Sequence, residues 1–383
     1  MRILPRFAVT AALFLAAPSL LFAQGSLGQQ GFGYPGGEQS TRSLGSGGSL
    51  ADFDANSPIN PAALLVGTRA TVYLQYDPEF RWITGQGVDA STITARFPLF
   101  LISGKVGQAR FSLSYASFLD RTWTNTYQDT QTIGGQRVPS TVTAVSTGGI
   151  ADIRAAASYS ISPRLTVGAG VHVFPGQNHM LFGRAYPADS TAFGAFSQTN
   201  TFNYSGSAVS FGVIAIPIEH VNLGVSGQYG FSMHVHEGDS TTLGDARVPN
   251  RMSYSIAYDG FPGSILSARY ATENWSAMRG LGSAGLSVFD ATEFAAGLET
   301  PGPRINSAIP LAVRLGYGAR QLPFGVGTEQ VKETQVNGGV GIPLSGGRVA
   351  LDLSLAHFLR TASNVSLTEK GWILSVGISI KPY

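Results

Sequence analysis

The chain of 383 residues contains no cysteine and little charge. The absence of cysteine excludes disulfide scaffolds, thiolate metal sites and thiol nucleophiles. Charged residues make up 13% of the chain, whereas soluble domains carry about 25%. Such a surface is too poor in charge for an ordinary cytosolic protein.

The net charge is also small, at +2 from 25 basic and 23 acidic residues. Two of the basic residues, Arg2 and Arg6, lie in an N-terminal segment that we expect to be removed, which leaves 23 basic against 23 acidic residues. A neutral chain has no basic field to attract nucleic acid, so we expect no nucleic-acid partner.

Residues 1–23 have the pattern of a secretory signal peptide. Arg2 and Arg6 precede an apolar run from Phe7 to Leu21, and this order predicts export with cleavage near Ala23. A membrane anchor is the alternative, but the run is shorter than the ~20 apolar residues that a spanning helix needs. The rest of the sequence has no comparable apolar stretch, so any membrane role must use strands.

Apolar side chains alternate with small or polar ones through most of the remaining chain. Between Val221 and Val235, apolar residues such as Leu223 take the odd positions, and small ones such as Ser226 take the even positions. This period of two is typical of strands with one apolar face. Fourteen segments show it: Val72–Tyr76, Ile93–Leu101, Phe111–Tyr115, Ile153–Ile161, Leu165–Val173, Val209–Ala215, Val221–Val235, Met252–Tyr258, Leu266–Tyr270, Phe294–Leu298, Leu311–Tyr317, Val336–Ile342, Val349–Leu355 and Leu374–Ile380.

The second face of these strands distinguishes a membrane barrel from a soluble sandwich. A sandwich would expose Lys, Glu and Thr there, but this chain mostly has Gly, Ser and Ala. Small residues suit the crowded interior of a closed cylinder whose apolar face meets lipid. We therefore predict an all-β fold, a transmembrane antiparallel β-barrel of 14 strands.

Connection lengths give a separate indication, because outer-membrane barrels alternate short periplasmic turns with longer external loops. Short turns are expected at 104–107, 162–164, 217–220, 259–263 and 344–347. Long loops are expected at 81–89, 125–147, 177–200, 237–247, 279–287, 323–328 and 361–367.

Aromatic residues near the long loops suggest an interfacial girdle, although strands favour aromatics in any case. These residues are Phe80, Trp82, Trp123, Tyr127, Phe174, Trp275, Phe324, Phe358 and Trp372. The chain ends on the aromatic residue Tyr383, which is common in such barrels, but its register is opposite to that of Leu374–Ile380.

A Gly- and Ser-rich stretch from Gly25 to Gly48 precedes Asn60-Pro61-Ala62, which stands directly before the first strand. Asn-Pro-Ala at this place resembles the N-terminal hatch of the FadL/TodX-like family, the outer-membrane transporters of long-chain fatty acids and aromatic hydrocarbons. Later motifs agree in order: Val248-Pro249, Phe261-Pro262-Gly263, Ile309-Pro310-Leu311 and Val349-Ala350-Leu351-Asp352. The resemblance covers nearly all of the chain that follows the signal peptide.

The resemblance implies fourteen strands, an N-terminal plug inside the barrel, and lateral release of apolar molecules into the membrane. The expected domains are a signal peptide (1–23), a hatch (24–66) and a transmembrane barrel (67–383). Asn60, Pro61 and Ala62 would belong to the hatch, near the ligand path. The family's lateral opening lies at a kink in the third strand, and here the alternation slips at Ala116, Ser117 and Phe118. A bulge explains the slip; the alternative is that the strand leaves the bilayer there.

Three other groups of residues have patterns typical of sites. Gly280–Gly285 matches a dinucleotide fingerprint, but no helical pattern follows it. His234 and His236, with Glu237 and Asp239 beside them, fall on the inward face and would suit a metal or an acid–base pair; polar rim residues are the preferred interpretation. Arg154, Arg269, Arg314 and Asp352 also fall on inward positions, where paired charges would brace the barrel against the plug.

Three functions are consistent with the sequence. The first is an outer-membrane channel for hydrophobic small molecules, without enzymatic activity, cofactor or metal, and surrounded as a monomer by outer-membrane lipid. The second is a membrane-embedded hydrolase, which needs His234 or His236 within reach of a Ser or Asp. The third is an assembly or secretion component, which would have a broad apolar external patch and no pocket. We favour the channel, in the outer membrane of a Gram-negative bacterium.

Overall fold

The computed structural model describes residues 32–67, 69–85, 88–187, 194–238, 241–281, 287–304, 309–362 and 367–382. The predicted signal peptide, Asp239, Gly282–Gly285 and Tyr383 lie outside the described residues. Among the described residues, no helix has both the length and the apolar character that crossing a membrane requires.

Strands make up most of the described chain. They are β1 (Tyr34–Pro35), β2 (Thr71–Gly85), β3 (Val88–Arg96), β4 (Leu99–Val106), β5 (Ala109–Asp120), β6 (Trp123–Ile133), β7 (Gln136–Ser162), β8 (Leu165–Val173), β9 (Gly176–Ala185), β10 (Phe196–Ile218), β11 (Val221–Glu237), β12 (Thr241–Arg247), β13 (Arg251–Phe261), β14 (Ser264–Glu273), β15 (Ala291–Pro301), β16 (Ala312–Val326), β17 (Glu329–Leu344), β18 (Val349–Ala362) and β19 (Leu367–Ile380). The helices are short: α1 (Thr41–Gly45), η2 (Ala51–Phe53), η3 (Pro61–Val66), η4 (Trp275–Leu281) and η5 (Ser345–Gly347).

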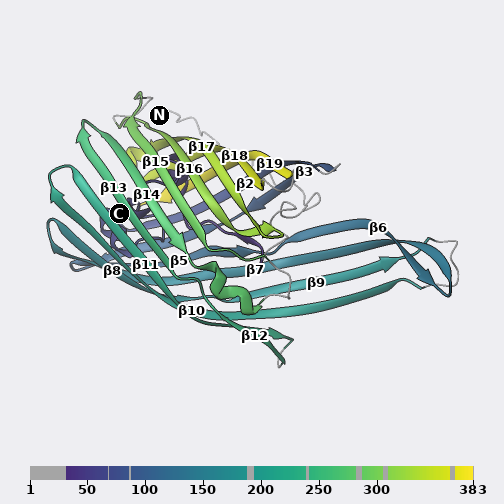
Figure 1. Cartoon of the computed structure of the whole chain (residues 1–383). Helices are drawn as coiled ribbons and strands as arrows, with labels where there is room; N and C mark the ends of the chain where they lie inside the picture. Colours follow the sequence, from purple (N-terminus) through teal and green to yellow (C-terminus); the bar gives the residue numbers. More distant parts are fainter. Residues whose placement is uncertain are drawn as a thin grey trace, which may run out of the picture.

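Fourteen of these strands form one closed antiparallel barrel, shown in Figure 1. Each strand pairs with the next one in the ring, and β19 pairs with β2 to close it, for example at Ile380 and Val72. The ring strands are β2, β4, β5, β7, β8, β10, β11, β13, β14, β15, β16, β17, β18 and β19. The all-β class, the barrel and the strand number are thus confirmed within the described residues.

The two faces of the barrel wall are as the alternation predicted. In β13, Tyr254 and Ile256 are 52% and 47% exposed, whereas Ser253 and Ser255 are 0% and 7% exposed. The apolar side chains therefore cover the outside, and the small ones face the lumen, where little room is left.

One predicted strand is in fact two. Ile93–Leu101 was expected to be continuous, but β3 ends at Arg96 and β4 begins at Leu99, and both pair with β2. Pro98 lies between them, and a proline cannot donate a hydrogen bond to a strand ladder. The second strand of the barrel wall is therefore interrupted at this point.

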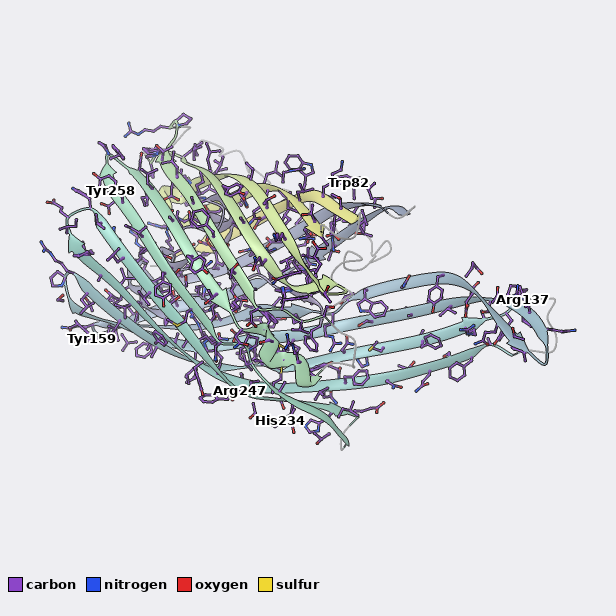
Figure 2. The ribbon with its side chains drawn as sticks, viewed as in Figure 1. Trp82, Arg137, Tyr159, His234, Arg247 and Tyr258 are labelled. Carbon is purple, nitrogen blue, oxygen red and sulfur yellow. The ribbon has the colours of Figure 1, made fainter. Side chains whose placement is uncertain are left out.

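Several predicted long loops consist largely of strands. Most of 81–89 lies in β2 and β3, most of 237–247 lies in β11 and β12, and 323–326 lies in β16. Residues 125–147 and 177–200 contribute to β6, β7, β9 and β10, which continue past the barrel as a four-stranded arm. Figure 2 shows Arg137 at the far end of this arm and Tyr159 and Tyr258 at the opposite end of the molecule. The arm is rich in Thr, a β-branched residue that favours strands even without an apolar stripe. The predicted short turns, in contrast, all lie between ring strands.

The predicted aromatic girdle is only partly right. Phe80, Trp82 and Trp372 are 36%, 44% and 41% exposed on the outer face. Phe174, Trp275, Phe324 and Phe358 are instead at most 3% exposed and belong to the interior. The sequence could not separate the two groups, because strands carry aromatics on either face.

The N-terminal residues from Phe32 to Val66 contact inward-facing parts of strands on opposite sides of the ring. Helix α1 packs against β16, β17, β18 and β19, while η3 packs against β5, β7, β8 and β10. Glycines in the wall make these contacts close: a Cβ on Gly212 would lie 1.9 Å from Asn60 Oδ1, and one on Gly316 would lie 2.0 Å from the Ser46 carbonyl carbon. The small inward residues thus accommodate this segment.

Candidate functional site

A cavity of about 170 Å³ lies between the N-terminal segment and the barrel wall. Its apolar lining includes Phe118 of β5, Trp275 of η4 and Leu322 of β16. The N-terminal segment contributes the stretch from Tyr34 to Gln39, together with Leu44 and Ile59. The site is thus assembled from the chain's start and from distant strands.

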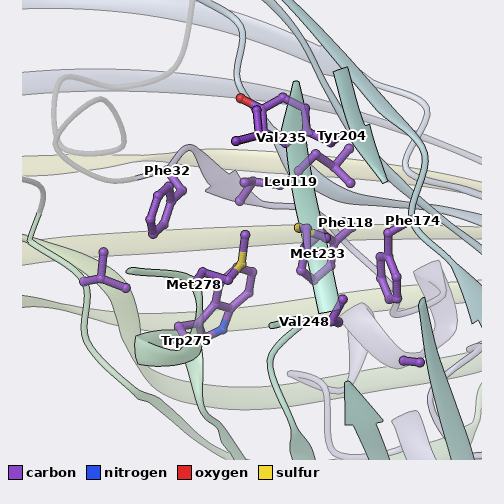
Figure 3. Close-up of a cluster of buried hydrophobic side chains, with 13 residues drawn as sticks. Phe32, Phe118, Leu119, Phe174, Tyr204, Met233, Val235, Val248, Trp275 and Met278 are labelled. Atoms are coloured by element: carbon purple, nitrogen blue, oxygen red, sulfur yellow. The ribbon is translucent and has the colours of Figure 1, made fainter. Parts of the chain in front are cut away.

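A cluster of buried apolar side chains adjoins this cavity (Figure 3). The Phe118 ring stacks on Trp275, with centroids 5.2 Å apart and planes at 12°, and meets the Phe174 ring edge-on at 4.9 Å. The other members include Phe32, Leu119, Tyr204, Met233, Val235, Val248 and Met278. Aromatic rings and methionines of this kind form an adaptable apolar surface.

Buried charges surround the remaining sides of the cavity, and most are paired. Glu38 of the N-terminal segment accepts a hydrogen bond from Arg251. Arg269 donates from Nε to Asp52 at 3.0 Å and pairs through Nη1 with Glu293 at 2.8 Å. Pairing offsets the cost of placing such groups away from water.

Asp52 is the best-satisfied carboxylate of the N-terminal segment. Besides Arg269, it accepts hydrogen bonds from Ser226, Ser253 and Ser255, each at 2.6 Å. Burial alone would raise the pKa of the Asp52 carboxyl, but Arg269 and the serines together lower it below its ordinary value. These partners come from β11, β13 and β14, so Asp52 fixes η2 to that side of the wall.

Asn60, Pro61 and Ala62 are completely or nearly buried next to the cavity, but Ile59 is the neighbour that lines it. Asn60 Oδ1 accepts a hydrogen bond from the Ala62 amide at 3.0 Å, and its Nδ2 donates to the Asp52 carbonyl at 3.1 Å. Asn60 thus caps η3 and links it to η2. None of these three residues lines the cavity, so their place near a ligand path stays a prediction.

The wall changes its pairing at Ala116, Ser117 and Phe118. Pairing of β5 with β4 ends at Ala116 and Leu99, and pairing of β5 with β7 shifts between Ser117 and Leu119. Beyond that point β1 pairs with the freed edge, with Pro35 opposite Leu119. The N-terminal segment thus supplies the strand that the interrupted wall lacks.

A second hollow, of about 840 Å³, lies at this place and is lined by outward residues such as Phe97 and Tyr115. Arg96 and Ser117 line both this groove and the inner cavity. The partition between them also includes Gly36, where a Cβ would lie 1.7 Å from the Ser117 carbonyl oxygen. Only a narrow layer of protein separates the cavity from the outside of the wall.

The four predicted inward charges are all buried, at 6% exposure or less. Arg269 braces the wall against Asp52, as described above. Arg314 donates hydrogen bonds to Glu299 at 2.6 Å and to Asp352 at 2.5 Å. Arg154 differs, because its guanidinium makes no hydrogen bond to any described residue.

The expected inward direction of His234 is wrong. Its side chain is 46% exposed and bonds Asp245 across the β11–β12 hairpin, while His236 lies near Thr242. Met233 and Val235 face inward instead, because the pairing of β10 with β11 shifts before Met233 and the strand changes phase there. Among the described residues, no group of three His, Asp or Glu could hold a metal ion.

Sequence reasoning did not find one buried polar arrangement. His172 Nδ1 lies 2.9 Å from both carboxylate oxygens of Asp152, and its Nε2 lies 2.8 Å from Ser210 Oγ. The three residues are on β7, β8 and β10, and are 4% exposed or less. No spacing along the chain could reveal this, because only the barrel brings the strands together.

Comparison with known proteins places this geometry in a fold. No protein-family model matches the sequence, and no curated protein matches it. A Pseudomonas aeruginosa FadL homologue is similar in structure, with a TM-score of 0.59 at 12% identity over 92% of this chain and 99% of that chain. The CymD monoaromatic hydrocarbon channel gives 0.57 at 12% over 92% and 98%, and the toluene transporter TodX of P. putida gives 0.56 at 14% over 93% and 99%. At these identities the likeness shows the fold.

Proposed function

We propose that this protein is an outer-membrane channel for passive uptake of small hydrophobic molecules. The ligand binds in the inner cavity and leaves sideways through the wall at β5. Residues 24–66 act as the plug, residues 67–383 form the membrane barrel, and residues 1–23 direct export. Transport of this kind requires no catalytic group, cofactor or energy source.

Cavity size is the observation that carries the proposal. An apolar cavity of about 150 Å³ is large enough for benzene, and the cavity here holds about 170 Å³. A single aromatic ring therefore fits, whereas a long fatty-acid chain could place only part of its length there. The fold relatives described as monoaromatic hydrocarbon and toluene transporters support this choice of ligand.

The expected affinity also suits a channel. Burying an aromatic ring removes about 150–250 Å² from water, which at ~25 cal/mol per Å² stabilises the complex by roughly 4–6 kcal/mol. Such a free energy corresponds to a Kd between about 1 mM and 40 μM. A ligand held this weakly leaves quickly.

The lateral route is supported by the shared partition. The cavity and the outer groove have Arg96 and Ser117 in common, and β1 covers the edge that β4 leaves free. Displacement of β1 together with the Arg96 side chain would join the two hollows. The route through the plug is less suitable, because it would carry an apolar molecule past the charges around Asp52 and Arg269.

Uptake of labelled toluene and labelled palmitate by cells with and without the gene tests the function. We expect faster entry of toluene and little effect on palmitate; equal toluene entry in both strains would refute the channel. A disulfide in Pro35→Cys/Leu119→Cys should block uptake until it is reduced, because facing residues in antiparallel strands lie at disulfide distance. Thr41→Cys/Ser375→Cys is the matched control, since those hydroxyls are 2.7 Å apart and join α1 to β19 instead of β1 to β5. The chain's lack of cysteine makes both pairs unambiguous.

Ester hydrolysis is a second candidate. The bond of His234 to Asp245 meets the criterion set from the sequence, but that pair is exposed, and the Asp152–His172–Ser210 arrangement is the stronger indication. Its geometry resembles a nucleophile, base and orienting carboxylate. Ser210 does not line the inner cavity, however, and is 4% exposed. Labelling of Ser210 by a fluorophosphonate would establish this activity, and no labelling would dismiss it.

A further inference from the structure

Tyr34 joins two distant parts of the barrel. Its backbone pairs with β5 opposite Asp120, while its side chain reaches residues of β16, β17 and β18. The side chain is 6% exposed. The ring of Tyr34 thus occupies a pocket that residues of the barrel wall form.

The pocket has the composition expected of a binding site for a phenol. Leu322, Phe324, Val331 and Ala362 form its apolar part, with the Phe324 ring centroid 6.1 Å from that of Tyr34. The Arg96 and Arg360 guanidiniums lie 5.0 and 4.6 Å from the ring centroid, within cation–π distance. An aromatic ring is therefore favoured on both counts.

Polar groups in the pocket specify a hydroxyl on that ring. Arg320 and Arg360 each donate a hydrogen bond to Tyr34 Oη at 2.5 Å, and the hydroxyl donates to Glu333 at 3.3 Å. Burial raises the pKa of Tyr34 to about 12, so the hydroxyl keeps its proton and acts as both donor and acceptor.

The pocket opens onto the proposed ligand cavity. Tyr34, Arg96, Arg320 and Leu322 line the cavity as well as the pocket. A small molecule in the cavity therefore touches the Tyr34 side chain, and it can replace Tyr34 in the pocket without the separation of two wall strands.

We propose that this pocket is a binding site for phenols, which Tyr34 occupies as a tethered substitute, and that a free phenol displacing Tyr34 releases β1 from β5. The inference rests on the proposed channel function and deepens it, since it names hydroxylated monoaromatic compounds as the ligands that actively open the lateral gap. Toluene binds the cavity alone and crosses the wall only when β1 separates from β5 spontaneously. Toluene lacks the hydroxyl and would leave Arg320, Arg360 and Glu333 without that partner. Sites that bind a substrate hydroxyl discriminate strongly against analogues without it.

Binding to purified full-length protein in detergent tests the site. The probe is 4-methylphenol, the side-chain analogue of tyrosine, and toluene is the comparison ligand. By isothermal titration, Tyr34→Ala should bind 4-methylphenol on the order of 100-fold more tightly than toluene. The wild-type protein should bind it far more weakly than the variant, because the tethered Tyr34 competes at an effective concentration of about millimolar. Equal binding of the two ligands by Tyr34→Ala would overturn the proposal.

Tyr34→Phe gives a second measurement in a protein whose pocket stays filled. Phenylalanine lacks the hydroxyl and competes less well, so 4-methylphenol should bind Tyr34→Phe more tightly than wild type; equal affinity would overturn the proposal. Disulfide formation in Pro35→Cys/Leu119→Cys should fall with 4-methylphenol and not with toluene, and an unchanged yield would refute the release of β1. If wild-type cells take up toluene but Tyr34→Ala binds no phenol, this inference fails and the channel function stands.

Discussion

Asp52 offers the sharpest test of how the N-terminal segment, the proposed plug, is held in the barrel. Its carboxylate accepts four hydrogen bonds from Ser226, Ser253, Ser255 and Arg269. Removing one partner of a buried ion pair costs about 3–5 kcal/mol. Arg269 would keep Glu293 at 2.8 Å, so Asp52→Ala should cost about 3 kcal/mol, near the lower limit.

This loss should affect the plug and leave the barrel intact, because the strand ladder does not depend on Asp52. A cost of about 3 kcal/mol raises the population with a detached plug on the order of 100-fold. In planar bilayers, Asp52→Ala should therefore open to a large conductance about 100 times as often as wild type. Asp52→Asn keeps an acceptor oxygen, and we expect a smaller increase.

The matched control is Asp259→Ala. Asp259 also bonds neighbouring side chains, His220 and Asn222, but it lies near the end of β13 and its side chain is 45% exposed. Its loss should leave the conductance unchanged. Equal opening frequencies for wild type and Asp52→Ala would show that the serine and arginine contacts do not hold the plug.

Two further predictions concern the same contact surface. Because the folded pKa of Asp52 is below its unfolded value, the stability that Asp52 contributes is complete above the ordinary aspartate range and is lost as the pH falls through the folded pKa. The frequency of large-conductance opening of the wild type should therefore be constant from pH 8 to about 5 and rise below about 4. A rise already at pH 6 would contradict this. Gly212→Ala should raise the opening frequency about tenfold in the same assay, because the new Cβ would lie 1.9 Å from Asn60 Oδ1 and overpacking costs about 1–3 kcal/mol. The control is Gly104→Ala, which has open space around the new Cβ and should behave as wild type. Equal behaviour of the two variants would refute the close contact.

The strands could be predicted because their signal is local. Alternation in segments such as Met252–Tyr258 fixes both the strand and its two faces. Prediction failed where a residue broke that period: Pro98 divides the second wall strand, and the shift before Met233 turns His234 outward. Proline and bulges change the direction of a chain without changing its average hydropathy.

The site was less accessible to sequence reasoning, because its residues meet only after the ring closes. Tyr34 lies in a Gly- and Ser-rich stretch that has the composition of a linker, yet it contacts Arg360, 326 positions away. Phe118 and Trp275 are also far apart in the sequence, yet their rings stack in the structure. The resemblance to a family supplied the place of the N-terminal segment, which composition alone would have left without structure.

The barrel explains where the few charged residues of this chain lie. Many charged side chains lie inside, and Arg81, Arg110, Arg154 and Arg360 are among the largest fully buried ones. Soluble proteins have the opposite distribution. Toward the N-terminal segment, an apolar ligand in the cavity meets the Arg269–Asp52 and Arg251–Glu38 pairs. Toward the wall it meets β1, Ser117 and Arg96, which pairs with Glu79 and Asp120. In the proposed channel, the sideways path past β1 therefore has the ion pairs of Arg96 as its charged barrier.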